Sequence, residues 1–185
     1  MQRDTAESLS LTTRALHWLI ALSIIGLLGV GIYMENTKAY ALYPLHKSFG
    51  VLIFALVLAR VVWRIKNGWP SANEQHAQWE RTLARVVHWC LILGTVLMPI
   101  SGFLMSSLGG HGVAVFGFEL VAANPDPADP TKVIPHNGAL AGMAHTAHGV
   151  VGTVMVVAVV LHIAGAWKHH LVDKDNTLKR MLGLK

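Results

Sequence analysis

Long apolar blocks separated by short polar segments dominate the chain. Residues 15–34, 86–118 and 133–167 contain no Asp, Glu, Lys or Arg. Each block reaches the roughly 20 residues that an α-helix needs to cross the hydrocarbon core of a bilayer. The pattern therefore predicts three membrane-spanning helices, at about residues 10–34, 83–107 and 139–168. The first block is longer than the apolar region of a signal peptide and lacks a small-residue cleavage site, so we expect a membrane helix there rather than a cleaved leader.

A fourth span is less obvious, because its uncharged block covers only residues 48–59. Arg60 and Arg64 follow this block, and a helix over residues 43–66 would still cross the membrane if these two side chains extend toward one surface. A buried or re-entrant segment is the alternative. We predict an all-α membrane protein in which residues 1–185 form a single domain, a four-transmembrane-helix bundle.

The connections between these helices differ in length. Residues 108–138 exceed what a bundle needs as a connection, which suggests a cap on the outer face or a docking surface. Within it, NPDPADP at 124–130 cannot form regular helix, and VAVFGFELV at 113–121 suits a short strand pair or an interfacial segment. Residues 67–82 form a predicted cytoplasmic loop with a Gly-Trp-Pro turn, and the basic tail at 171–185 is expected to lie along the inner surface.

Lysines and arginines gather on one side of the predicted bundle. Of the 15 basic residues, only Lys38, Lys47 and Lys132 fall on the other side. Because short loops rich in Lys and Arg stay in the cytoplasm, both termini are predicted to be cytoplasmic. The net charge of +5 reflects this bias. The basic residues flank helices and form no separate basic domain, which argues against nucleic-acid binding.

Composition agrees with a membrane protein and excludes some metal centres. Hydrophobic residues make up 53% of the chain and charged residues 14%, compared with about 25% charged residues in a soluble domain. The single cysteine, Cys90, can form neither an internal disulfide nor a Cys-x-x-Cys motif. Iron–sulfur clusters and c-type haem attachment are therefore excluded.

Four histidines lie inside the predicted helices at matching depths. His148 and His162 are 14 residues apart, so they lie about 40° apart around one helix and about 21 Å apart along it. His17 lies at the depth of His162 on the inner side, and His46 lies at the depth of His148 on the outer side. A buried imidazole needs a partner, and two such pairs suit bis-histidine ligation of two b-type haems, an arrangement for electron transfer.

Other roles and other ligands remain open. A single intramembrane histidine can hydrogen-bond to a neighbouring helix or take part in a proton path. His145 lies one turn from His148 and could replace it. His88 could replace His17 or His162, and we interpret it as a polar neighbour of the inner haem or of a quinone.

Basic residues near the histidines are consistent with bound haem. Arg14 and Arg85, together with Arg60 and Arg64, lie at the inner ends of the helices, where the propionate carboxylates of an inner haem would lie. Lys47 could serve an outer haem in the same way. Anchoring to lipid headgroups explains these cations equally well.

Small residues also flank the four histidines. They could let a flat macrocycle approach the backbone, although ordinary helix packing through small residues is the alternative. The residues are Gly50, Gly149, Gly152 and Gly165.

Four short strings carry a family resemblance. They are RALHW at 14–18, LHKSFG at 45–50, ARVVHW at 84–89 and KDNTLKRM at 174–181. With these strings the whole chain resembles the bacterial cytochrome b561 family, which is related to the cytochrome b subunits of formate dehydrogenase and nickel–iron hydrogenase. The resemblance implies two b haems ligated at the positions of His17, His46, His148 and His162. It also implies exchange of electrons with the quinone pool, and often a homodimer.

The expected function is electron transfer across the bacterial inner membrane, between a periplasmic redox protein and quinone. The resemblance also implies a second hypothesis, superoxide:ubiquinone oxidoreductase activity. An anionic substrate needs a basic funnel, and the outer lysines are offset by nearby acidic residues, although Lys38 and Lys47 could form a local basic mouth. A third hypothesis is an anchor subunit of a larger dehydrogenase. A fourth is a haem-free transporter or proton channel, against which the lack of acidic residues inside the spans argues.

Overall fold

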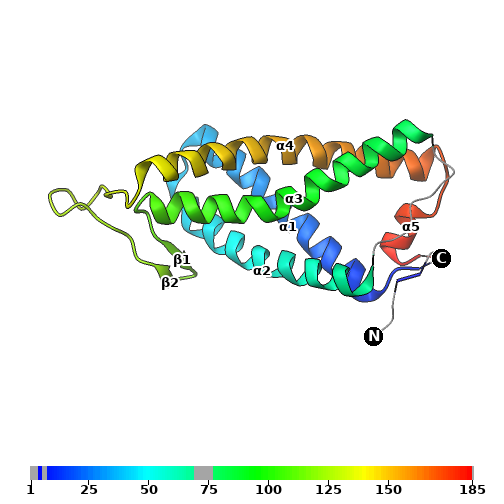
Figure 1. Ribbon diagram of the computed structural model, residues 1–185, viewed down its shortest axis with the longest axis horizontal. Coiled ribbons are helices and arrows are strands. Elements are labelled where there is room, and N and C mark those ends of the chain that lie inside the picture. The colour runs from blue at the N-terminus through cyan, green and yellow to red at the C-terminus, as the bar shows by residue number, and fades with distance from the viewer. Residues whose placement is uncertain (1–3, 6–7, 69–76, 185) are drawn as a thin grey trace.

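Four long helices form a bundle (Figure 1) in the computed structural model, which describes residues 4–5, 8–68 and 77–184. All four are long and apolar enough to cross a membrane. They are α1 (Leu11–Thr37), α2 (Tyr43–Asn67), α3 (Gln78–Leu108) and α4 (Gly138–Leu171). The prediction of four helices is confirmed. The second is one continuous helix through Arg60 and Arg64, as the prediction of a fourth span requires.

Helix boundaries follow local chemistry more closely than hydropathy does. The Ser10 side chain accepts a hydrogen bond from the N–H of Thr13 and begins α1, and Asn137 caps α4 in the same way through the N–H of Leu140. α3 begins at Gln78, earlier than the predicted residue 83. Hydropathy placed the start too late because the first turn of α3 is polar and contains Glu80. Hydropathy marks only the apolar part of a helix that continues beyond the hydrocarbon.

The helices run up and down, so both ends of the chain lie at one end of the bundle (Figure 1). We call this the terminal end, and we call the opposite end the hairpin end. α3 lies alongside α4 and α1 contacts α2. Figure 1 shows α3 bent along its length. Pro99 lies inside α3, where it lacks an N–H and its ring crowds the carbonyl of Thr95, one turn earlier, which is a common cause of such a bend.

A layer of apolar side chains closes the middle of the bundle. Met155 of α4 is fully buried at its centre. A side chain at Gly94 of α3 would clash with the Met155 thioether, so glycine at position 94 lets α3 and α4 approach closely. We call this the central layer; its members are Ile20, Ile24, Ile53, Val57, Gly94 and Met155.

The connection from α3 to α4 contains the predicted strand pair. β1 (Val113–Val115) and β2 (Phe118–Val121) pair antiparallel, with an irregularity in register next to Val113. Residues 124–130 form no helix, as predicted. Residues 69–76 of the predicted loop at 67–82 lie outside the described part of the chain, and the prediction of a loop is wrong for residues 78–82, which are the first turns of α3.

Two short helices complete the fold. The 3₁₀ helix η1 (Tyr40–Leu42) leads into α2, and α5 (Thr177–Leu182) follows α4. α5 returns to the start of α1, where the indole N–H of Trp18 donates to the carbonyl of Met181 at 2.9 Å. The basic tail therefore packs against the terminal end of the bundle.

Candidate functional site

The hairpin end holds the pair His46 and His148, from the first turns of α2 and the first third of α4. Both imidazoles are partly buried. The Nδ1 atom of His46 is buried and has no hydrogen-bond partner among the described residues. Gly31 of α1 faces this ring, since a Cβ atom there would lie 3.6 Å from His46 Cε1.

His148 is held in one orientation by α3. Its Nδ1 lies 3.1 Å from the carbonyl oxygen of Met98 and 3.1 Å from the hydroxyl of Ser101. A carbonyl can only accept, so Nδ1 carries the proton and donates to Met98. The Nε2 atom then keeps its lone pair, which is the form of imidazole that binds a metal ion.

Space for the His148 ring depends on a glycine of α3. A Cβ atom at Gly102 would lie 3.1 Å from His148 Cε1 and 3.3 Å from Nδ1, closer than a comfortable contact. The sequence does not predict which residues of α3 contact His148, namely Met98, Ser101 and Gly102. Their role depends on how α3 lies against α4, which periodicity alone does not give.

Three imidazoles gather at the terminal end. The ring centroids of His17 and His162 are 6.2 Å apart, and those of His88 and His162 are 5.2 Å apart. Arg60 of α2 donates from Nη2 to His17 Nδ1 at 3.2 Å, because a guanidinium can only donate. The structure therefore places His88 as close to His162 as His17 is, and both remain candidate partners for it.

The central layer separates these two groups of imidazoles. Met155 lies seven residues after His148 and seven before His162 in α4, so each histidine is about 10 Å from it along the helix. Across the described chain, no three His, Cys, Asp or Glu side chains gather as a site for a single metal ion. The arrangement places His46 and His148 toward the hairpin end and the three imidazoles of His17, His88 and His162 toward the terminal end.

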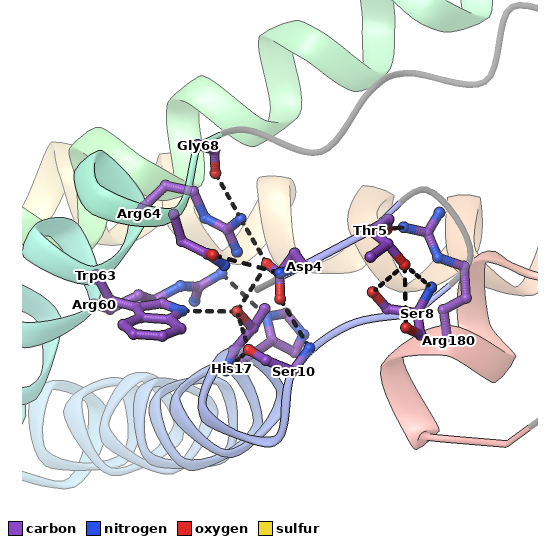
Figure 2. Close-up of polar contacts among 12 residues, drawn as sticks. Asp4, Thr5, Ser8, Ser10, His17, Arg60, Trp63, Arg64, Gly68 and Arg180 are labelled. Carbon is purple, nitrogen blue, oxygen red and sulfur yellow. Dashed lines mark hydrogen bonds and ion pairs between the residues drawn. The ribbon is translucent and has the colours of Figure 1, made fainter. Parts of the chain in front are cut away.

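An ion pair covers the terminal end near His17 (Figure 2). Asp4 and Arg64 lie 3.1 Å apart with side chains only 7% and 13% exposed. Asp4 also accepts from the Ser10 N–H at 2.8 Å and the Thr13 hydroxyl at 2.9 Å, and Trp63 donates to Thr13 at 2.8 Å. Burial raises the pKa of Asp4, but these hydrogen bonds and Arg64 outweigh it and leave the pKa below its usual value.

Three further predicted positions are those of Arg14, Arg85 and His145. Arg14 lines an open cavity of about 410 Å³ between α1 and α5, and His17 is not among the residues that line it. The Arg85 and His145 side chains are exposed on α3 and α4. The predicted propionate contact of Arg14 or Arg85, and the alternative ligand role of His145, remain predictions.

Lys47 follows His46 in the sequence, and its side chain bonds to the last turn of α3 and to the connection that follows it. Its Nζ donates to the hydroxyl of Ser106 and to the carbonyl of Gly112, both at 3.0 Å. Its predicted contact with an outer haem remains a prediction.

Known proteins with similar sequences resemble this chain over nearly its full length. Residues 8–184 match the family described as prokaryotic cytochrome b561. The chain belongs to the prokaryotic cytochrome b561 family. "Cytochrome b561 homolog 2" of Escherichia coli strain K12 is 34% identical over 97% of this chain and 94% of that protein.

Two further relatives are more distant. "Probable superoxide oxidase CybB" of Yersinia pestis is 28% identical over 92% of this chain and 93% of its own length. "Cytochrome b561 homolog 1" of Escherichia coli strain K12 is 23% identical over 90% of this chain and 92% of its own length. Members of this family are membrane cytochromes that transfer electrons, and the family implies b-type haem.

The two imidazole pairs fit b-type haem. Metal–imidazole bonds are about 2 Å long, so two histidines that held one metal ion would have ring centroids roughly 6 Å apart, close to the 6.2 Å between His17 and His162. At the other end, His148 has the required tautomer and His46 has an orphaned buried nitrogen. A Cβ atom at Gly50, Gly149 or Gly165 would meet nothing within 4 Å, and one at Gly152 would lie 3.6 Å from Met98 Cε, so a role for these glycines beside a macrocycle remains a prediction.

Proposed function

We propose that this protein carries electrons across the bacterial inner membrane through two bis-histidine b-type haems. His46 and His148 would hold one haem at the hairpin end, and His17 and His162 the other at the terminal end. The observation that supports this most strongly is the pairing of imidazoles on opposite sides of the central layer. Two histidine ligands for each haem would suit electron transfer rather than oxygen binding.

The protein would orient the histidine ligands, exclude water between the two haems and place a positive charge near one of them. When bound, each haem would supply a one-electron couple between ferric and ferrous iron. The bond from His148 Nδ1 to Met98 fixes the ring, and Met155 excludes water between the two sites. Ligation through Nε2 of His17 would leave a proton on Nδ1, so Arg60 would turn from this atom and its charge would be available to a haem carboxylate.

The proposed orientation in the membrane follows from the distribution of basic residues. Both termini lie at the same end, which we propose to be cytoplasmic because 12 of the 15 Lys and Arg residues lie on that side. An electron donor would then act at the periplasmic hairpin end. We propose that quinone binds near His88 and Arg85 at the terminal end, and that the protein forms homodimers as the family resemblance implies.

Oxidation of superoxide is a second candidate, favoured by the name of the Yersinia pestis relative. At the hairpin end Lys38 pairs with Glu35 at 3.0 Å and Lys132 pairs with Asp129 at 3.0 Å. Lys47 bonds to neutral oxygen atoms, so its charge could attract an anion. Reduction of the haems by superoxide in a stopped-flow experiment, with slower reduction in Lys47→Met, would support this candidate.

The decisive experiment counts haems in histidine variants. The purified protein should contain two low-spin b haems per chain, and His148→Ala and His17→Ala should each retain one. His145→Ala and His88→Ala are the matched controls and should retain both. Loss of a haem in His88→Ala with retention in His17→Ala would assign His88 as the ligand. A folded protein without haem would overturn the proposal.

A further inference from the structure

The turn between β1 and β2 places a bulky aromatic residue in a conformation that it adopts at a cost. Phe116 has φ 47° and Gly117 has φ 89°, which is the pattern of the two-residue type I′ hairpin turn. Gly117 suits its position, but Asn or Gly normally occupies the first position, and a left-handed aromatic residue is an outlier. Such a residue persists when surrounding contacts hold it, often for function.

Contacts with the first turns of α2 hold this turn in place. The N–H of Phe116 donates to the hydroxyl of Ser48 at 3.0 Å. The ring of Phe116 packs edge-on against Phe49, with centroids 5.3 Å apart. Lys47 donates to the carbonyl of Gly112 just before β1. The hairpin is therefore fixed along the side of α2, as Figure 1 also shows.

The tip of the hairpin continues the apolar outer surface of α2. We define the hairpin tip as residues 115–118. Phe116 and Phe118 are 56% and 72% exposed. The neighbouring side chains Leu45, Phe49 and Leu52 of α2 are also exposed, at 44–48%. Because α2 crosses the membrane, this side of it faces lipid, and the exposed rings of the tip extend the same surface.

The depth of Phe49 shows where the tip lies relative to the bilayer. The midpoints of the four helices fall at or next to the central layer; in α2 the midpoint is residue 55. Phe49 is six residues from it, or about 9 Å at 1.5 Å per residue. Half of the hydrocarbon thickness is about 15 Å. The Phe116 ring against Phe49 therefore lies inside the lipid leaflet or at its boundary.

We propose that the hairpin tip is an aromatic anchor that inserts into the lipid leaflet at the hairpin end. Aromatic side chains favour this boundary, where one face meets hydrocarbon and the backbone remains near water. Glu119 points to the opposite face of β2 from Phe118, so its carboxylate can stay among the headgroups. The anchor holds the α3–α4 connection over the His46 and His148 pair. The proposal depends on the membrane span of α2 and not on the haems.

The first experiment measures which molecule meets Phe118 in membranes. The full chain is produced with p-benzoylphenylalanine at position 118, reconstituted into phosphatidylethanolamine–phosphatidylglycerol vesicles and irradiated. Mass spectrometry should find a phospholipid adduct at position 118 and none when the same residue is placed at Ala128 in the exposed part of the connection. A cross-link to a second copy of the chain, or no lipid adduct, would overturn the proposal.

The second experiment separates the aromatic ring from the turn. In a Cys90→Ser background, the thiol of Phe118→Cys should react with a charged, membrane-impermeant reagent much more slowly than the thiol of Ala128→Cys. Adding Phe116→Asn suits the turn but removes the ring, so it should increase the reaction rate at position 118 by about tenfold while circular dichroism is unchanged. A tenfold change corresponds to about 1.4 kcal/mol, close to the lower value for exposing one aromatic side chain. An unchanged rate would show that Phe116 is not the anchor.

Discussion

The fit between Gly102 and His148 predicts that a single added side chain removes one haem and spares the other. In Gly102→Val the new Cβ would lie 3.1 Å from Cε1 of His148 and 3.3 Å from Nδ1. The ring cannot retreat without losing its hydrogen bond to the Met98 carbonyl. Overpacking costs about 1–3 kcal/mol and the lost hydrogen bond about 1 kcal/mol. The sum of about 2–4 kcal/mol corresponds to roughly thirty- to a thousandfold weaker haem binding.

The assay is the haem content of the purified variant, with reduced-minus-oxidised spectra and a redox titration. Gly102→Val should contain one haem per chain, with the spectrum and potential of the terminal-end haem unchanged. Gly142→Val is the matched control, because a Cβ at that position of α4 meets nothing within 4 Å. It should retain both haems. Two haems in Gly102→Val, with unchanged potentials, would refute the argument that His148 is held against α3 as a ligand.

Three further predictions follow from buried contacts. Asp4→Asn should lower the free energy of unfolding by about 2 kcal/mol, because it leaves Arg64 without its buried partner. Folding lowers the pKa of Asp4. The stabilisation by the Asp4 carboxylate is therefore complete above the unfolded pKa of about 3.9 and is lost as pH falls through the folded pKa. Acid denaturation curves of the wild-type protein and Asp4→Asn should converge below the folded pKa. Gly94→Ala should destabilise by about 1–3 kcal/mol and by clearly less in a Met155→Ala background, measured by a double-mutant cycle in denaturant. Lys47→Met should increase hydrogen exchange at residues 113–121, since it removes the bond to the carbonyl before β1.

The features that sequence predicts here are those carried by a single helix. Runs without charge locate four spans because the bilayer tolerates few ionised groups, and the 14 residues from His148 to His162 give their separation along α4. The start of α3 at Gln78 was missed because a polar first turn has no hydropathy signal. The sequence of residues 113–121 suits either a strand pair or an interfacial segment, and the structure shows the strand pair.

Features that depend on contacts between helices could not be predicted in the same way. The sequence places His17, His88 and His162 at one depth, but only the packing shows that His88 lies as near to His162 as His17 does. The Arg60 contact with His17 depends on the rotation of α2 about its axis. The depth of a histidine can be read from its own helix, but the choice between His17 and His88 as the partner of His162 depends on how the helices pack.

Under the proposed two-haem arrangement, Met155 and Gly94 would matter to electron transfer. The distance between two redox sites sets the rate at which an electron passes between them, so the two proposed haems would have to be held apart without admitting water. Seven residues of α4 on each side of Met155 fix the separation along the helix. The close approach of α3 at Gly94 fixes it across the bundle, because a larger residue there would push α3 from α4 and move Gly102 and Ser101 away from His148. The central layer therefore positions the hairpin-end imidazole as well as insulating it from the terminal end.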